Sequence, residues 1–158
     1  MAIEPTTYAR YLGLAASASP QLLLPLASSR ASAGYPSPAE DFLDGGIDLN
    51  DALIRNPAAT YLYRAEGWSM LHAGICDGDI LIVDRSVQPR DGDIVVATWE
   101  GNQPACKVLK VCSDHLELQS RNPHCPNIVL GPDAEPEIFA VVGVVRQMRR
   151  SHGRVRSG

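Results

Sequence analysis

The chain has few lysines, no close cysteine pair and no long apolar run. Of its 14 basic residues, only Lys107 and Lys110 are lysines. Its four cysteines include no Cys-x-x-Cys pair, so neither a disulfide framework nor a zinc ribbon is indicated. No stretch approaches the roughly 20 apolar residues that a membrane-spanning helix requires. We therefore expect a protein of the reducing cytoplasm, with no membrane association and no cofactor.

A metal site would require the scattered cysteine and histidine side chains to meet. The side chains available are those of Cys106, Cys112, His115, His124 and Cys125. Their spacing matches no common zinc pattern, and they fall on separate predicted strands or turns. We predict no metal site.

Charge is divided unevenly along the chain. All 18 acidic residues lie before position 146, whereas residues 146–158 carry five arginines and no acid. A basic tail of this kind could contact nucleic acid or an acidic partner. A solvated, frayed chain end has the same composition, and this is the interpretation we favour. We assign residues 149–158 to an Arg-rich C-terminal tail.

Residues 1–40 are rich in alanine, serine and proline, and Pro36 and Pro38 favour extended backbone in the residues that precede them. We predict a flexible arm outside the core. Within it, Leu22–Ser28 is apolar and Ala31-Ser32-Ala33 has the small-x-small form of a signal-peptidase site. The first thirteen residues, however, hold one Glu and one Arg, and polar residues interrupt the apolar part. Export is therefore not favoured.

From residue 60 onward, short runs rich in β-branched residues alternate with turn dipeptides. The turn dipeptides are Asp77-Gly78, Asp91-Gly92, Glu100-Gly101 and Gly131-Pro132. We predict strands over 60–65, 80–84, 94–99, 105–112, 116–120, 128–130 and 138–145. A short helix is expected between Asp48 and Asn56, with Asp48 as its N-cap. The predicted fold class is mainly β, a compact and mostly antiparallel domain over residues 41–148.

One serine lies in a position typical of a nucleophile. The segment Gly67-Trp68-Ser69-Met70 follows a predicted strand and precedes a glycine-containing loop, where backbone N–H groups can converge on an oxyanion. The pattern is weak alone, because an isolated loop serine usually caps a turn. The histidines are poorly placed as bases: His72 is three residues away, and the others lie in polar turns or the tail.

Lysine is the remaining amine base, because arginine keeps its proton at neutral pH. In a strand, Lys107 shares a face with Ala105, Leu109 and Val111, whereas Lys110 lies on the opposite face. Burial disfavours the ammonium form, and lowering a lysine pKa from ~10.4 to about 7.5 corresponds to roughly 4 kcal/mol. An ordinary strand lysine that extends to solvent fits the same pattern. The residues alone leave both interpretations open.

Several segments, taken together and in order, resemble the LexA/UmuD family of self-cleaving serine peptidases, of the peptidase S24 type. The main ones are GWSM at 67–70, GICDGDILIVD at 74–84, GDIVVA at 92–97 and CKVL at 106–109. Three further segments are similar to UmuD-like members in particular: AGYPSPA at 33–39, IDLN at 47–50 and VVGVV at 141–145. The resemblance implies the compact C-terminal-type β domain of that family with an extended N-terminal arm.

The resemblance also implies roles for individual residues. Ser69 becomes the nucleophile, Lys107 its neutral-amine base, and the backbone amides of Trp68 and Ser69 the oxyanion donors. Ala33-Gly34 aligns with the bond that the chain cuts in itself, and its small side chains suit a narrow cleft. Trp68 departs from the Asp or Met common at that position.

The function that the resemblance implies is in SOS mutagenesis. A RecA filament on single-stranded DNA would promote autocleavage, and the shortened homodimer would join a Y-family, UmuC-like polymerase for error-prone translesion synthesis. We expect no sequence-specific DNA binding, because residues 1–40 are too short for a DNA-binding domain. Two alternatives remain open: a non-catalytic polymerase-binding module, and a signal-peptidase-like serine-lysine protease that acts on other chains.

Overall fold

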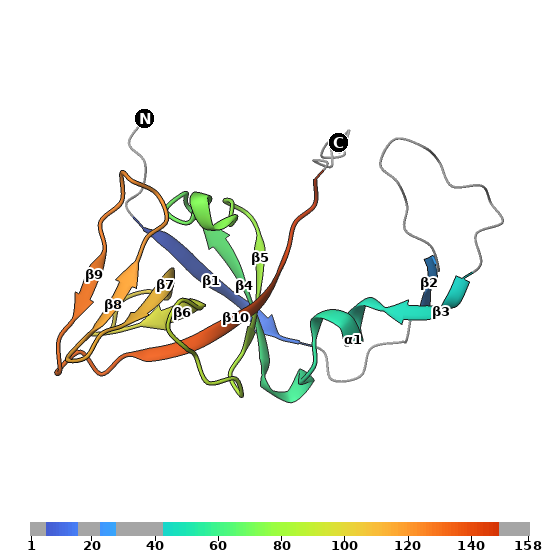
Figure 1. Cartoon of the computed structure of the whole chain (residues 1–158), viewed down its shortest axis with the longest axis horizontal. Helices are drawn as coiled ribbons and strands as arrows, with labels where there is room; N and C mark the ends of the chain where they lie inside the picture. The colour runs from blue at the N-terminus through green and yellow to red at the C-terminus, as the bar shows by residue number, and fades with distance from the viewer. Residues whose placement is uncertain (1–5, 16–22, 28–42, 149–158) are drawn as a thin grey trace, which may run out of the picture.

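The computed structural model describes residues 6–15, 23–27 and 43–148, which are organised around one large antiparallel sheet (Figure 1). Its eight strands are β1 (Thr7–Leu14), β4 (Thr60–Glu66), β5 (Ile80–Asp84), β6 (Ile94–Thr98), β7 (Ala105–Val111), β8 (Leu116–Gln119), β9 (Ile128–Leu130) and β10 (Glu137–Val145). A separate pair consists of β2 (Leu23–Ala27) and β3 (Leu43–Asp48). Short helical segments follow β3 and β4: α1 (Leu49–Leu53), η1 (Pro57–Ala59) and η2 (Leu71–Ala73). The prediction of a mainly β fold is confirmed.

The elements predicted from residue 48 onward are found with the strand ends within one residue of their expected positions. The turn glycines explain this agreement, because Gly78, Gly92 and Gly101 have φ values of 89°, 89° and 74°, in the left-handed region that glycine adopts readily. The helix begins as expected, since the Asp48 side chain accepts a hydrogen bond of 2.9 Å from the Asn50 N–H.

Strand β1 closes the sheet on itself. The strand order is β1-β4-β5-β10-β6-β7-β8-β9, and β1 also pairs with β7. Its pairing with β4 runs from Tyr8 opposite Glu66 to Leu14 opposite Tyr61. At its start it pairs with β7 as well, with Thr7 opposite Cys106. Six strands thus form a closed ring in which β1, blue in Figure 1, joins β4 to β7.

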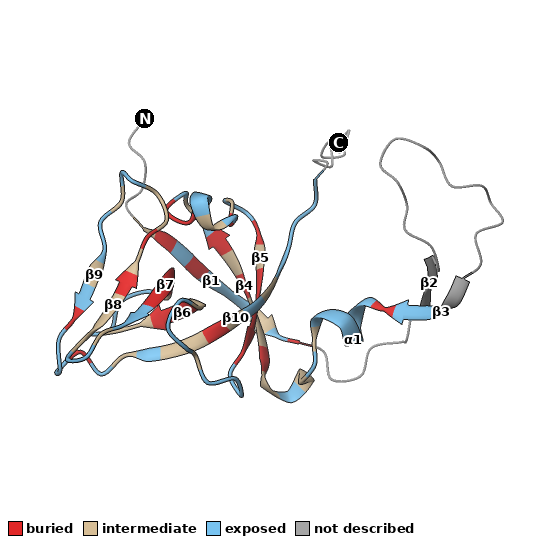
Figure 2. Ribbon diagram, viewed as in Figure 1, coloured by how far each residue is buried: buried red, intermediate tan, exposed pale blue. Residues whose placement is uncertain are grey.

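The expectation that all of residues 1–40 lie outside the core is therefore wrong for residues 7–14. Thr7 and Ala9 are 0% and 1% exposed, while the side chains between and after them face solvent (Figure 2). Tyr11, on the same face as Thr7 and Ala9 but half-exposed, packs edge to face against the buried Tyr63 with ring centroids 5.5 Å apart. The strand escaped prediction because its buried side chains are small and one of them is polar, so it lacks the usual apolar alternation.

Strand β7 is covered on both of its faces. Cys106 and Val108 belong to a core cluster that includes Ala9, whereas Leu109 belongs to a second cluster with Leu118. Residues 105–109 are consequently all buried (Figure 2). No helix in the part of the chain that the structure describes is long and apolar enough to cross a membrane.

Candidate active site

Ser69 lies in the turn between β4 and β5, and its backbone is held in place from two sides. Gly67 has φ +115°, and a Cβ at this position would lie 2.8 Å from the Thr6 carbonyl oxygen, so glycine is required. The Ser69 carbonyl oxygen accepts a hydrogen bond of 2.7 Å from the Arg121 N–H. The turn is therefore fixed between β1 and the loop that follows β8.

Lys107 approaches the Ser69 side chain from β7. Its Nζ lies 3.4 Å from Ser69 Oγ, and both side chains are 0% exposed. Lys110 is exposed instead and lies 3.9 Å from Asp91. Both faces of β7 are buried as far as Leu109, and Lys110 is exposed because it lies near the end of the strand. The structure thus decides between the two interpretations of Lys107 and brings this lysine and Ser69 together.

The surroundings of Lys107 favour its neutral form. Burial lowers the pKa of the Lys107 amine below its ordinary value. Among the described residues, Nζ hydrogen-bonds to two hydroxyl groups and to no carboxylate. Negative charge on Cys125, and to a smaller extent on Cys106, would oppose this effect. Burial raises the pKa of the Cys106 thiol to about 12. Lys107 can therefore supply a free lone pair to a serine hydroxyl at lower pH than an exposed lysine.

Ser120 is a member of the site that sequence reasoning missed. Its Oγ accepts a hydrogen bond of 2.9 Å from Lys107 Nζ and donates one of 3.0 Å to the Pro126 carbonyl oxygen. Its N–H donates to the Asn127 side chain. The register of the β7–β8 hairpin explains its position: Val108 pairs with Gln119, and one step further places Ser120 opposite Lys107.

Thr7 is the second missed residue, and it contacts Ser69 directly. The Thr7 N–H donates to Ser69 Oγ at 2.7 Å, and Thr7 Oγ1 accepts from the Ser69 N–H at 2.9 Å. Ser69 Oγ also donates to Thr7 Oγ1 at 2.7 Å. No pattern in the sequence marked Thr7, because its role follows from a contact between two residues that lie 62 positions apart in the chain.

The two predicted oxyanion donors, the backbone amides of Trp68 and Ser69, lie in the turn after β4 and have different hydrogen-bond partners nearby. The Ser69 N–H points to the same side as its hydroxyl, where Thr7 Oγ1 accepts from it. Trp68 contributes its carbonyl oxygen to the anchoring of the turn, since that oxygen accepts a hydrogen bond of 3.1 Å from the Asn122 side chain. The oxyanion role of the two amides stays a prediction. The predicted cleavage pair, Ala33-Gly34, lies outside the described residues, in the segment between β2 and β3.

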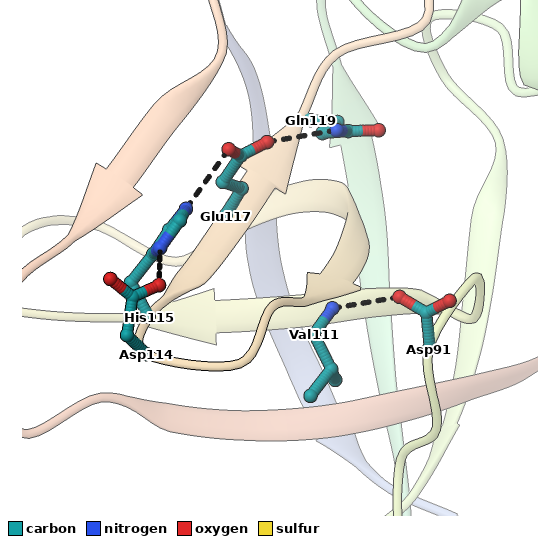
Figure 3. A network of polar contacts seen from close by, with 6 residues as sticks. All are labelled: Asp91, Val111, Asp114, His115, Glu117 and Gln119. Carbon is teal, nitrogen blue, oxygen red and sulfur yellow. Dashed lines mark hydrogen bonds and ion pairs between the residues drawn. The ribbon is translucent and has the colours of Figure 1, made fainter.

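A polar cluster lies away from Ser69, at the β7–β8 hairpin. Cys112, His115 and Glu117 each place one possible ligand atom within 4.8 Å of the others. Both ring nitrogens of His115 face carboxylates: Nδ1 lies 2.7 Å from Asp114 and Nε2 lies 3.1 Å from Glu117 (Figure 3). These contacts hold the His115 ring between two carboxylates. They also raise the pKa of His115, with the hydrogen bond to Asp114 as the largest cause.

The structure combines a closed antiparallel sheet with a buried serine beside a buried lysine, as the resemblance to self-cleaving serine peptidases predicts. Comparison with known protein families supports the same class. The chain belongs to the Peptidase S24-like family, whose match covers residues 25–145. The resemblance to the LexA/UmuD type of self-cleaving serine peptidase is thereby confirmed at the level of the family. Strand β1 precedes the matched region.

Individual relatives cover most of the chain. It is similar to protein ImpA of Salmonella typhimurium, with 40% identity over 121 residues, or 77% of this chain and 79% of ImpA. Protein SamA of Salmonella typhimurium is 38% identical over 125 residues, or 79% of this chain and 84% of SamA. The LexA repressor of Bordetella avium is 36% identical over 132 residues, which are 84% of this chain but 59% of the repressor.

Proposed function

We propose that the protein is a self-cleaving serine peptidase in which Ser69 attacks the chain's own Ala33-Gly34 bond and Lys107 acts as the general base. One observation carries the proposal. A buried amine whose pKa is lowered by burial lies 3.4 Å from a buried serine hydroxyl. A hydroxyl is a weak nucleophile at neutral pH, and a neighbouring base that accepts its proton activates it.

The proposed reaction follows from these positions. Neutral Lys107 takes the Ser69 Oγ proton as Oγ bonds to the Ala33 carbonyl carbon. The Ser69 N–H, with that of Trp68, stabilises the charge that develops on the carbonyl oxygen. Lys107 then gives its proton to the Gly34 nitrogen as the peptide bond breaks, which leaves an ester between Ser69 and Ala33. Water hydrolyses this ester with Lys107 again as the base, and Ser69 is restored.

The biological part of the proposal rests on the family resemblance. A RecA filament on single-stranded DNA promotes the cleavage, and the shortened form acts as a homodimer with a Y-family, UmuC-like polymerase in error-prone synthesis in the cytoplasm. An intramolecular substrate has a high effective concentration. The rate is then limited by the fraction of molecules with a neutral lysine and a correctly docked bond.

The experiment is to incubate the purified full chain at pH 7.5 and at about pH 10, with and without RecA on single-stranded DNA, and to record intact masses. We expect a fragment that begins at Gly34 and forms faster at alkaline pH or with RecA. Ser69→Ala should form none. A protein that stays intact under all these conditions would instead be a non-catalytic binding module, and a Ser69→Ala protein that is cut equally fast would indicate another protease.

A further inference from the structure

Strand β1 places Thr7 against the hydroxyl and the N–H of Ser69, the two groups that the proposed cleavage segment would have to reach. We propose, on the basis of the function above, that the groove between β4 and β7 is a binding site for an extended peptide strand. In this structure its occupant is the chain's own segment 6–9, which competes with residues 33 and 34 for Ser69. Docked β1 therefore holds the peptidase inactive, and autocleavage requires its first residues to leave the groove.

The first step of the argument is that Thr7 uses every group of Ser69 that catalysis needs. Thr7 Oγ1 accepts from both the Ser69 N–H and the Ser69 Oγ, and the Thr7 N–H donates to Oγ. Both residues are 0% exposed. No other peptide can reach the Ser69 hydroxyl while Thr7 remains in place.

The second step is that this arrangement cannot react. Nucleophilic attack requires a carbonyl carbon in front of Ser69 Oγ and the carbonyl oxygen at the Ser69 N–H. Thr7 instead presents an amide N–H to Oγ and a hydroxyl to the Ser69 N–H. The Ser69 hydroxyl proton is directed to Thr7 Oγ1 and not to Lys107. β1 thus resembles a bound substrate strand with no bond that can be cut.

The third step concerns the groove itself. β1 adds as a strand between β4 and β7, which is how extended peptides bind to open sheet edges. With β7 it shares only the pairs of Thr7 with Cys106 and Tyr8 with Ala105. The family match begins at residue 25, so the occupant lies outside the matched peptidase region. The groove is therefore formed by the peptidase domain, and β1 is a separate segment that fills it.

The fourth step is that β1 can be released in part. Its register against β4 shifts between Tyr11 and Gly13, and Gly13 has φ +150°. An irregularity of this kind interrupts the ladder and bends the strand. The end near Ser69 can therefore lift while Leu14 stays paired with Tyr61.

The first test compares two threonines with the same substitution. Thr7→Val keeps the shape of the side chain but removes the oxygen that accepts both Ser69 hydrogen bonds. Thr6→Val makes the same change in the adjacent residue, whose side chain points to the opposite face of an extended chain. We expect Thr7→Val to cleave itself about tenfold faster than the wild type at pH 7.5 without RecA, and Thr6→Val to match the wild type. Equal rates for all three proteins would overturn the proposal.

The second test locks β1 in the groove. Tyr8 and Ala105 are directly opposite each other on antiparallel strands, at a Cα separation that a disulfide can span. The double variant Tyr8→Cys/Ala105→Cys should not cleave itself when oxidised, even at alkaline pH, and should cleave at the wild-type rate after reduction. Each single variant, under the same oxidant, is the matched control. Equal cleavage by the oxidised and reduced double variant would overturn the proposal.

A third measurement separates this proposal from the proposed function. In a Ser69→Ala background, a synthetic peptide of residues 28–40 should bind the reduced double variant but not the oxidised one. If no form of the chain ever cleaves itself, the proposed function fails, yet this binding difference still shows that β1 competes for the groove. Equal peptide binding by the two forms overturns the competition whether or not cleavage occurs.

Discussion

Ser120 Oγ lies 2.9 Å from Lys107 Nζ, which is closer than the 3.4 Å between Lys107 Nζ and Ser69 Oγ. Ser120 is itself fixed by the Pro126 carbonyl oxygen and the Asn127 side chain. A neutral amine must direct its lone pair to the serine hydroxyl, and a hydrogen bond from one N–H to Ser120 holds it in that orientation. Ser120 is thus a positioning residue for the proposed base.

Replacement of Ser120 should therefore slow cleavage without abolishing it. Loss of one hydrogen bond to the amine costs roughly 1 to 1.5 kcal/mol, or about tenfold in rate for Ser120→Ala. Because the hydroxyl accepts from the ammonium form as well, the midpoint of the pH-rate profile should also move to lower pH. Ser120→Thr keeps the hydroxyl and should restore much of the rate. A Ser120→Ala profile identical to that of the wild type would contradict the positioning role.

Replacement of Lys107 should lower the rate of self-cleavage, whereas replacement of Lys110 should not change it. Lys107→Arg keeps a positive charge but cannot act as a base, so single-turnover cleavage should fall by at least ~10²-fold. Lys110→Arg changes an exposed side chain on the other face of the same strand and should leave the rate unchanged. The comparison is made from fragment formation at several pH values. Normal cleavage by Lys107→Arg would exclude Lys107 as the base.

Burial of Lys107 should also change how the free energy of unfolding depends on pH. Its pKa is lowered in the folded chain, so between the folded and unfolded pKa values the unfolded chain binds more protons. Stability should therefore rise with pH in this window by up to ~1.4 kcal/mol per pH unit, and this contribution is lost as pH falls through the folded pKa. Urea unfolding of Ser69→Ala at pH 7.5 and 9.5 measures the effect.

The control for this measurement is Ser69→Ala/Lys107→Met, in which an apolar side chain of similar length replaces the amine. Its stability should lack the rise that Lys107 contributes between the two pH values. If both proteins changed equally with pH, the amine would not be the group responsible.

The His115 network should titrate independently of cleavage. Hydrogen bonds to Asp114 and Glu117 favour the protonated ring, so the pKa of His115 lies above its ordinary value (Figure 3). Asp114→Asn removes the larger of these effects and should lower the pKa of His115. Titration of the His115 ring signals by NMR measures both values, and His72→Gln helps to assign the resonances. An unchanged His115 pKa in Asp114→Asn would contradict this assignment of causes.

The body of the fold could be predicted because each of its strands carries local information. β-branched runs end at glycine turns, so the strand bounds could be read from the sequence. Which lysine is buried could not, because both faces of β7 are covered and only its end is exposed. The remaining features depend on pairing between distant segments. Thr7 reaches Ser69 through the closure of the sheet by β1, and Ser120 reaches Lys107 through the register of a hairpin. Neither residue belongs to a local motif, so sequence patterns alone did not indicate them.

The position of β1 in the sheet changes what cutting the chain at residue 33 would produce. The N-terminal piece would retain a strand paired with β4 and a second strand, β2, paired with β3. Breaking one peptide bond removes none of these pairings. The immediate product would thus be a nicked complex of two pieces, with the mass of the intact chain plus one water. The pieces would separate only when β1 dissociates from β4 and β2 dissociates from β3.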